Sequence, residues 1–326
     1  MRSTIITAAI VLATLPSAAL AQDACPAMRW TTLGTAGGPI PTLDRAEPAN
    51  MLEAGDTVIL VDTGDGTADA VAKLGWPIGD VKHVFISHLH WDHVGGLAAV
   101  LGLRWMNTYT DEITVHGPPG TAQVVEGIVM SLRPQERVGF GTGAAVADPA
   151  ANIRVVELPL DDQTFELADG ITVRARTNTH YDFPLEEIGT TSLSYRFDMG
   201  GRSITYSGDT GPSEDLTELA AGTDMLVTEV IALEPLVADI LAKRPDMPPP
   251  VQASMRQHLA THHVDAAEVG RMAATAGVGH VVLTHFAVPP VALHESEDYL
   301  RSGVRQSYSG PLDLARDLSS FDVGCD

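Results

Sequence analysis

Short apolar runs rich in β-branched residues recur along the chain, and polar or glycine-rich segments separate them. Runs of this kind are typical of strands with at least one buried face. Residues 49–53 and 57–62 predict a hairpin, because the Gly-Asp pair at 55–56 is a frequent turn sequence. Further strands are predicted at 28–33, 81–87, 113–115, 153–158, 171–177, 192–197, 202–206, 225–228 and 280–284.

Helices are predicted where apolar positions recur every three to four residues. These segments are 67–74, 121–132, 213–221, 231–241, 264–276 and 312–318, the last followed by a short terminal strand. Residues 133–151 are rich in Gly, Ala and Pro and predict a mobile loop, of a length often found in lids. Residues 244–250 contain four prolines, and we expect the 231–257 insertion to form a second wall of the functional site. The strands fall into two halves with no linker between them, which indicates one domain.

The first residues are typical of a secretory signal peptide rather than of the folded chain. Arg2 gives a positive start, residues 5–15 form an apolar core, and the Ala-Leu-Ala sequence at 19–21 is a cleavage site. We therefore expect cleavage before Gln22, a periplasmic or secreted protein, and a single domain over 22–326. No later apolar run approaches membrane-spanning length, so we expect no membrane partner.

Charge and cysteine content narrow the partners further. The chain has 42 acidic and 20 basic side chains and a net charge of −22, which disfavours contact with nucleic-acid backbones over most of the surface. We therefore expect no nucleic-acid partner. The two cysteines, Cys25 and Cys325, lie at opposite ends of the mature chain and could form a disulfide in an oxidising compartment; two unpaired thiols are the alternative. The oligomeric state stays open, and a homodimer is one option.

The densest chemistry lies in residues 87–96, which read Ser-His-Leu-His-Trp-Asp-His-Val-Gly-Gly. His88, His90, Asp92 and His93 fall within six positions directly after a predicted buried strand. Histidine and carboxylate are ligands that zinc and similar divalent metals prefer. The alternating spacing of the first two histidines suits a loop better than a helix. This stretch therefore predicts a metal site at the end of a core strand.

The His-x-His-x-Asp-His pattern resembles the signature of the metallo-β-lactamase superfamily. Three further ligands of that family have matching positions, each after or within a predicted strand: His180, Asp209 and His285. The resemblance implies a four-layer αβ/βα sandwich in the α/β class, with two divalent metal ions at one edge. It implies that His88, His90 and His180 hold one ion, that Asp92, His93 and His285 hold the other, and that Asp209 bridges them. Zinc suits this donor set best, and iron or manganese are alternatives.

The C-terminal third is similar to the tRNase Z and secreted arylsulfatase branch of the superfamily. In that branch a strand-end glutamate and a histidine before the next helix act together on the scissile ester; Glu229 and His263 match these positions, with His262 adjacent. We take Asp92, Glu229, His262 and His263 as candidate catalytic residues. A helix-capping role for one histidine of the doublet is the alternative. The chain lacks a Lys/Arg-rich arm that could bind precursor tRNA, so we prefer the hypothesis of an arylsulfatase-like activity to that of a tRNase activity.

We therefore expect a dinuclear hydrolase of small anionic sulfate esters or phosphodiesters. Lactone or thioester hydrolysis is the alternative, and the bridging Asp209 leaves β-lactam hydrolysis as a minor activity. A metal-binding relative without activity is disfavoured by the complete ligand set, and an iron oxidoreductase by the lack of a flavodoxin-like domain. Trp91, Tyr181 and Phe183 flank ligands and could form an apolar wall for an aryl or nucleoside group, or could merely pack behind the ligands.

Overall fold

The structure is a computed structural model of the chain. It describes residues 28–38, 40–141, 146–159, 162–181, 185–289 and 293–324. The predicted signal peptide and its cleavage site, the Cys25–Cys325 pair and Phe183 lie outside the described residues.

Strands and helices alternate in two series along the chain. The strands are β1 (Met28–Gly34), β2 (Ala49–Ala54), β3 (Thr57–Thr63), β4 (Val81–Phe85), β5 (Ile113–Gly117), β6 (Ile153–Glu157), β7 (Gln163–Glu166), β8 (Thr172–Thr177), β9 (Leu193–Met199), β10 (Arg202–Tyr206), β11 (Met225–Ile231), β12 (His280–Ala287), β13 (Leu312–Leu314) and β14 (Ser319–Val323). The helices are α1 (Thr67–Lys73), α2 (Trp91–Val94), α3 (Leu97–Met106), α4 (Thr121–Val138), α5 (Leu185–Ile188), α6 (Glu214–Leu219), α7 (Leu233–Lys243), α8 (Pro249–His262), α9 (Ala266–Ala276) and α10 (His294–Val304). Two short 3₁₀ helices, η1 (Ile78–Asp80) and η2 (Ala168–Gly170), precede β4 and β8.

The described strands form two seven-stranded mixed sheets, in the orders β14-β1-β2-β3-β4-β5-β6 and β13-β12-β11-β10-β9-β8-β7. In the first sheet, β3 to β6 run parallel and the other neighbours are antiparallel. In the second sheet, β10 to β13 run parallel and β7 to β10 antiparallel. Each half therefore has a block of parallel strands whose carboxyl ends open on one edge, where ligand sites of α/β sheets usually form.

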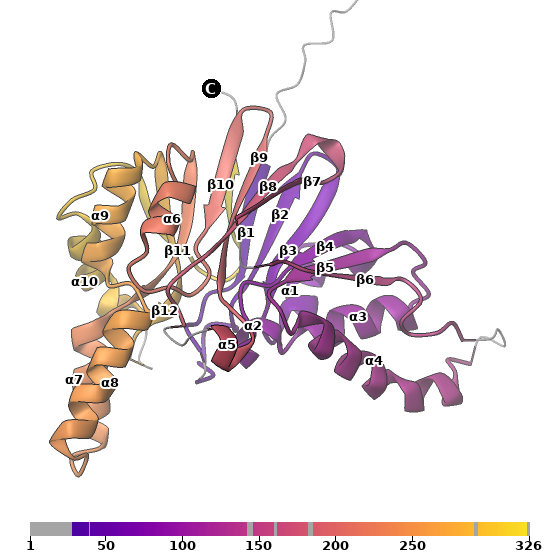
Figure 1. Cartoon of the computed structure of the whole chain (residues 1–326), viewed down its shortest axis with the longest axis horizontal. Helices are drawn as coiled ribbons and strands as arrows, with labels where there is room; N and C mark the ends of the chain where they lie inside the picture. Colours follow the sequence, from indigo (N-terminus) through magenta and orange to yellow (C-terminus); the bar gives the residue numbers. More distant parts are fainter. Residues whose placement is uncertain are drawn as a thin grey trace, which may run out of the picture.

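Three apolar clusters hold four layers together. The central cluster packs the sheets face to face and contains large buried rings such as Trp30, Phe85 and Tyr195. A second cluster packs the second sheet against α6, α9 and α10, and a third packs the first sheet against α1, α3 and α4. Figure 1 shows these helices on the outer faces, with α2 and α5 between the ends of the two halves. The predicted four-layer α/β sandwich is confirmed.

Several element predictions are wrong in detail. Residues 312–318 do not form a helix: Leu312–Leu314 is β13, which pairs in parallel with β12 at the edge of the second sheet. The predicted loop at 133–151 begins later, because α4 continues to Val138. Pro134 is tolerated inside α4 on its exposed side, and an Arg133–Glu136 ion pair at 3.0 Å lies across the same turn.

The elements β7, α2, α3, α5, α8 and α10 were not anticipated by the apolar pattern. In α8 the prolines at 248–250 interrupt nothing, because they lie at its N-cap and first turn, where the absent N–H groups would have no helical partner. The 231–257 insertion is thus a helical hairpin of α7 and α8, which projects from the body in Figure 1. Within the described part of the chain, no helix combines the length and apolar character needed to cross a bilayer.

Candidate metal centre

The predicted ligands converge at the carboxyl-end edge of both parallel blocks. His88 and His90 lie in the loop after β4, and Asp92 and His93 lie on the short helix α2 that follows. His180 follows β8 and Asp209 follows β10. Seven side chains from separate parts of the sequence therefore meet because the strands that carry them end at the same edge.

His285 comes from inside β12 rather than from a loop. Residues 284 and 285 together face one residue of β11, because the pairing changes from Thr228–Leu283 to Val230–Phe286. His285 also has a positive φ of 42°. A bulge of this kind redirects a side chain, and here it accompanies an imidazole that reaches Asp209, with Nε2 3.1 Å from Oδ1.

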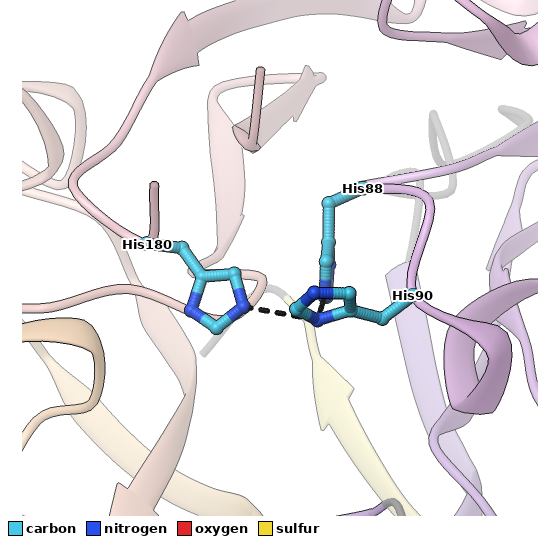
Figure 2. A group of neighbouring side chains, drawn as sticks. All are labelled: His88, His90 and His180. Carbon is cyan, nitrogen blue, oxygen red and sulfur yellow. Dashed lines mark hydrogen bonds between the residues drawn. The ribbon is translucent and has the colours of Figure 1, made fainter. Parts of the chain in front are cut away.

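His88, His90 and His180 form one candidate metal-binding group, with donor atoms within 4.8 Å of one another. Nδ1 of His90 lies 2.9 Å from Nε2 of His88 and 3.1 Å from Nε2 of His180. Figure 2 shows the three rings turned toward a common point, His180 from one half of the fold and the other two from the opposite half. His88 and His180 are buried, whereas His90 is exposed.

Asp92, His93 and His285 form a second candidate group, and Asp209 lies between the groups. Nε2 of His93 is 3.5 Å from Oδ2 of Asp92 and 3.4 Å from Oδ1 of Asp209. Oδ2 of Asp209 faces the first group and is 3.9 Å from Nε2 of His88. This is the position that the family resemblance predicts for a bridging aspartate.

Buried atoms without partners show that the donor set fits a metal. Nε2 of His93, Oδ1 of Asp209 and both ring nitrogens of His285 are buried and lack a hydrogen-bond partner among the described residues. Buried polar atoms are nearly always hydrogen-bonded, so four unpaired atoms in one place call for an explanation. Imidazole nitrogens and a carboxylate oxygen pointing at a common space match the donors of a divalent ion.

A fully buried carboxylate behind α2 fixes His93. Asp62, whose φ is +56°, accepts hydrogen bonds from Ser87 N (2.7 Å), Ser87 Oγ (2.7 Å) and the Tyr206 hydroxyl (2.8 Å). Its Oδ2 is also 2.8 Å from Nδ1 of His93. The carboxylate therefore keeps the proton on Nδ1 and leaves Nε2 of His93 as the acceptor toward the metal site, a common second partner of metal-bound histidine.

The two histidines of the predicted doublet have different surroundings. Nδ1 of His263 is 2.7 Å from Oε2 of the buried Glu229, whose other oxygen accepts from the backbone N–H of Thr210. The ring of His262 packs against His258 at 4.1 Å between centroids. Its carbonyl oxygen lies 2.9 Å from Nδ1 of His180 and orients that ring. The geometry thus places only His263 beside Glu229.

Charges in the centre shift several pKa values of the metal-free protein. Burial lowers the pKa of His93, but Asp209 and Asp62 outweigh burial and raise it well above its usual value. Burial alone would raise the pKa of Asp209, but His285 and His93 hold it well below its usual range. Burial lowers the pKa of His180 to about 3. Protons and metal ions therefore compete for His93, since a metal-bound imidazole must give up its acidic proton.

A cavity of about 890 Å³ opens onto the centre. The exposed Trp91 lines it, and so do apolar side chains of α7 and α8. Tyr181 also lines it and packs against the rings of His88, His90 and His180, with centroids 5.2 to 5.9 Å away. Trp91 and Tyr181 therefore both border the cavity, and Tyr181 supports the ligand rings in addition.

Three neighbours of the centre carried no recognisable sequence motif. Arg45 lines the cavity, with Nε and Nη1 buried and without a hydrogen-bond partner in the described chain; Asp44 is 3.6 Å from Nη1. Glu47 lies near Asp92. Its burial, and to a lesser extent the negative charge of Asp92, raises the pKa of Glu47. Gly38 passes so close that a Cβ there would lie 2.2 Å from Oδ2 of Asp92. All three lie between β1 and β2, in a segment for which the sequence predicted no element and no function.

Comparison with known proteins places this arrangement in a family. The family model described as "Beta-lactamase superfamily domain" matches residues 57–286, which include all seven candidate ligands. The chain belongs to the β-lactamase superfamily. Within the superfamily, Ribonuclease Z of Mycobacterium avium (strain 104) is 32% identical over 298 residues, covering 90% of this chain and 97% of that protein. Ribonuclease Z of Mycobacterium marinum is 31% identical over 296 residues, covering 90% and 98%. The predicted tRNase Z branch is thereby confirmed.

Solved structures of the superfamily agree on the fold. A metallo-β-lactamase fold protein of Bacillus subtilis matches with a TM-score of 0.65 at 20% identity, covering 91% of this chain and all of that chain. The short form of human tRNase Z matches with a TM-score of 0.61 at 20% identity, covering 90% and 98%. The family model and the ribonuclease relatives, rather than these structures, identify the chain as a metal-dependent hydrolase of this superfamily.

The relatives overturn three expectations. The small sulfate ester or phosphodiester substrate, the lactone or thioester alternative and the arylsulfatase reading are wrong, because relatives covering 90% of the chain are ribonucleases. The same names contradict the expectation of no nucleic-acid partner. Total charge misled here because it averages the whole surface, whereas Arg45, Lys243 and Arg244 line the cavity. The expected periplasmic or secreted location is also contradicted, since these relatives are enzymes of RNA; it rested on residues 2–21, outside the described residues.

Proposed function

We propose that the chain is a ribonuclease of the ribonuclease Z type, which hydrolyses a phosphodiester bond in RNA with the help of two divalent metal ions. The convergent cluster of seven His and Asp side chains carries this proposal. The similarity to ribonucleases Z over nearly their whole length supports the choice of RNA as substrate.

In this proposal His88, His90 and His180 hold one ion, and Asp92, His93 and His285 hold the other. Asp209 contributes one oxygen to each. Two bound ions supply Lewis-acid chemistry, by activating water and by neutralising charge on phosphoryl oxygens. Zinc is the metal best suited to a set rich in histidine, and manganese or iron are the alternatives.

Asp92 and Asp209 serve as anions. Burial raises the pKa of Asp92, but the nearby imidazoles of His285 and His93 outweigh it and lower the value to about 2 in the metal-free protein. Asp92 is 9% exposed, lines the cavity and is next to the substrate space. It is therefore a ligand that can also accept a hydrogen bond from the attacking water.

His263 is proposed as the general acid for the leaving group. Its Nδ1 is engaged by Glu229 at 2.7 Å, and the residue lines the cavity. The second ring nitrogen is consequently the one that can donate a proton to the departing ribose oxygen. Glu229 is a positioning residue, which fixes the ring and stabilises its cationic form. The adjacent His262 also lines the cavity, and its carbonyl oxygen orients the ring of His180.

The test uses zinc-loaded protein and a precursor tRNA that carries a 3′ extension. We expect a single endonucleolytic cut that requires the metal and is lost in Asp209→Ala. Glu126→Gln is the matched control, because Glu126 is an exposed acid on α4 far from the cluster. Absence of cleavage of this precursor and of other structured RNAs by wild-type protein with two bound ions would refute the proposal.

A further inference from the structure

Trp91 is an unusually exposed aromatic residue at the centre of the candidate site. It is 79% exposed although its chain neighbours are the proposed ligands His90 and Asp92. The edge of its indole ring lies over Gly95, where a Cβ would come within 3.0 Å of Nε1. The absence of a side chain at Gly95 thus lets one edge of the indole pack against the end of α2. The rest of the indole surface lines the cavity. An indole held in this way offers a large, flat contact surface to a ligand in the cavity.

The opposite wall of the cavity is apolar too. Leu236 and Ile240 on α7 and Leu259 on α8 line it and are only partly buried, and Ile40 lines it at 64% exposure. The helical hairpin that carries them projects beyond the sandwich (Figure 1), so these side chains are not needed to complete the central cores. An apolar wall therefore faces an exposed indole across a space that opens on the metal centre.

The chemistry of this cavity selects a flat, apolar group that is attached to the scissile phosphodiester. Among the described residues, three cationic side chains, Arg45, Lys243 and Arg244, line the cavity, so part of the affinity has to come from contacts that carry no charge. Stacking of a base on an aromatic side chain is such a contact, and it tolerates any base because each has a π-face.

We propose that Trp91, together with the apolar faces of α7 and α8, forms a stacking subsite for an unpaired base adjacent to the scissile bond. This inference rests on the proposed ribonuclease function. A base can enter the cavity only when it is not paired, so the subsite restricts cleavage to single-stranded junctions. Stacking on an indole uses the π-face that every base has, so the subsite also predicts weak base preference.

Binding without turnover tests the subsite separately from the ribonuclease function. Calorimetry on the zinc-loaded protein would compare uridine 5′-monophosphate with ribose 5-phosphate, which has the same phosphate and sugar but no base. We expect the nucleotide to bind about 5- to 100-fold more tightly, the range for one stacked base. Trp91→Ala should remove this difference and Trp91→Phe should restore most of it, with the zinc content of both variants equal to wild type.

Val251→Ala is the control on the same hairpin, because Val251 is 50% exposed on α8 and does not line the cavity. It should leave both affinities unchanged. Equal binding of nucleotide and ribose phosphate by wild type would overturn the subsite, and so would an unchanged difference in Trp91→Ala.

Cleavage assays then distinguish the two proposals. A precursor RNA with an abasic ribose beside the cut should show a KM raised by the same factor in wild type but not in Trp91→Ala. A fully paired junction should resist cleavage by both proteins. If wild type cuts RNA but treats the abasic and intact substrates alike, the subsite is wrong and the ribonuclease function stands. If wild type cuts no RNA yet still prefers the nucleotide in calorimetry, the ribonuclease function fails and the base-binding cavity stands.

Discussion

Replacement of Asp62 by Asn tests whether a residue outside the ligand set controls metal binding. One carboxylate oxygen accepts from the backbone N–H of Ser87, and the other faces the Ser87 hydroxyl, the Tyr206 hydroxyl and Nδ1 of His93. An amide can keep only one acceptor oxygen. If that oxygen stays on the Ser87 N–H, the amide NH₂ faces His93 and forces its proton onto Nε2, the nitrogen that should bind metal.

The opposite orientation of the amide is also costly. It would place two N–H groups against each other, that of Ser87 and that of the new side chain, in a fully buried position. Loss of a hydrogen bond to a charged group costs about 1.5–3 kcal/mol. Because about 1.4 kcal/mol corresponds to a factor of ten, Asp62→Asn should weaken binding of the ion on His93 by roughly 10- to 150-fold.

Competition with a chromophoric zinc chelator would measure this loss, and metal analysis after dialysis would count the ions that remain. Asp224→Asn is a matched control, because Asp224 accepts from the backbone N–H and hydroxyl of Ser203 in the same manner, at 2.8 and 3.0 Å, away from the proposed ligands. The control should lose stability and keep both ions. Two ions held with wild-type affinity in Asp62→Asn would refute the tautomer argument.

Three further predictions concern catalysis, RNA binding and pH. His263→Ala should lower the cleavage rate by about 10²–10⁴-fold at unchanged metal content, and a nitrophenyl leaving group should remove most of that loss; an equal loss for both substrates would contradict the general-acid role. Affinity for RNA should depend only moderately on salt, with a log–log slope of roughly −2 to −3, because three cations, Arg45, Lys243 and Arg244, line the cavity; a slope steeper than about −4 would reveal a basic surface elsewhere. Burial lowers the pKa of His285, but Asp209 outweighs it and raises the value to about 10. Protonated His285 therefore contributes fully to the free energy of unfolding below the unfolded-state pKa of about 6.5, and this contribution is lost as pH rises toward 10. Chemical denaturation should show that the free energy of unfolding of metal-free protein falls between about pH 6.5 and 10, whereas that of zinc-loaded protein does not change.

The structure brings the predicted ligands together, and this grouping could be anticipated because much of its information is local. The His88–His93 stretch and the strand before it are contiguous, His180 and Asp209 follow recognisable strands, and His285 lies inside one. The Asp62–Tyr206 contact could not be anticipated, since 144 positions separate the two residues and only the packing of the two sheets brings them together. The family resemblance matched His263 to Glu229 but left His262 as a further candidate, because the sequence does not show in which direction adjacent residues at a helix end face.

The errors in the fold have physical causes of the same kind. Leu312–Leu314 forms a strand because the exposed edge of β12 is available for pairing, which local propensity does not reveal. The prolines before α8 were interpreted as a break because proline disrupts a helix interior, yet in the first turn it is favoured. Arg45 and Glu47 lie in a segment without periodicity, and only the closed fold shows that they border the centre.

Neither sheet alone supplies a complete set of donors for either metal position. His88 and His90 depend on His180 from the opposite half, and Asp92 and His93 depend on His285. Each bound ion would therefore cross-link the two structural halves, which are otherwise joined by apolar packing. Removal of the metal should therefore open the interface between the halves first at the edge where the strands end. Amide hydrogens at that edge should then exchange faster, while those deep in the sheets keep their protection. In such a protein, loss of activity and opening of the architecture begin at the same place.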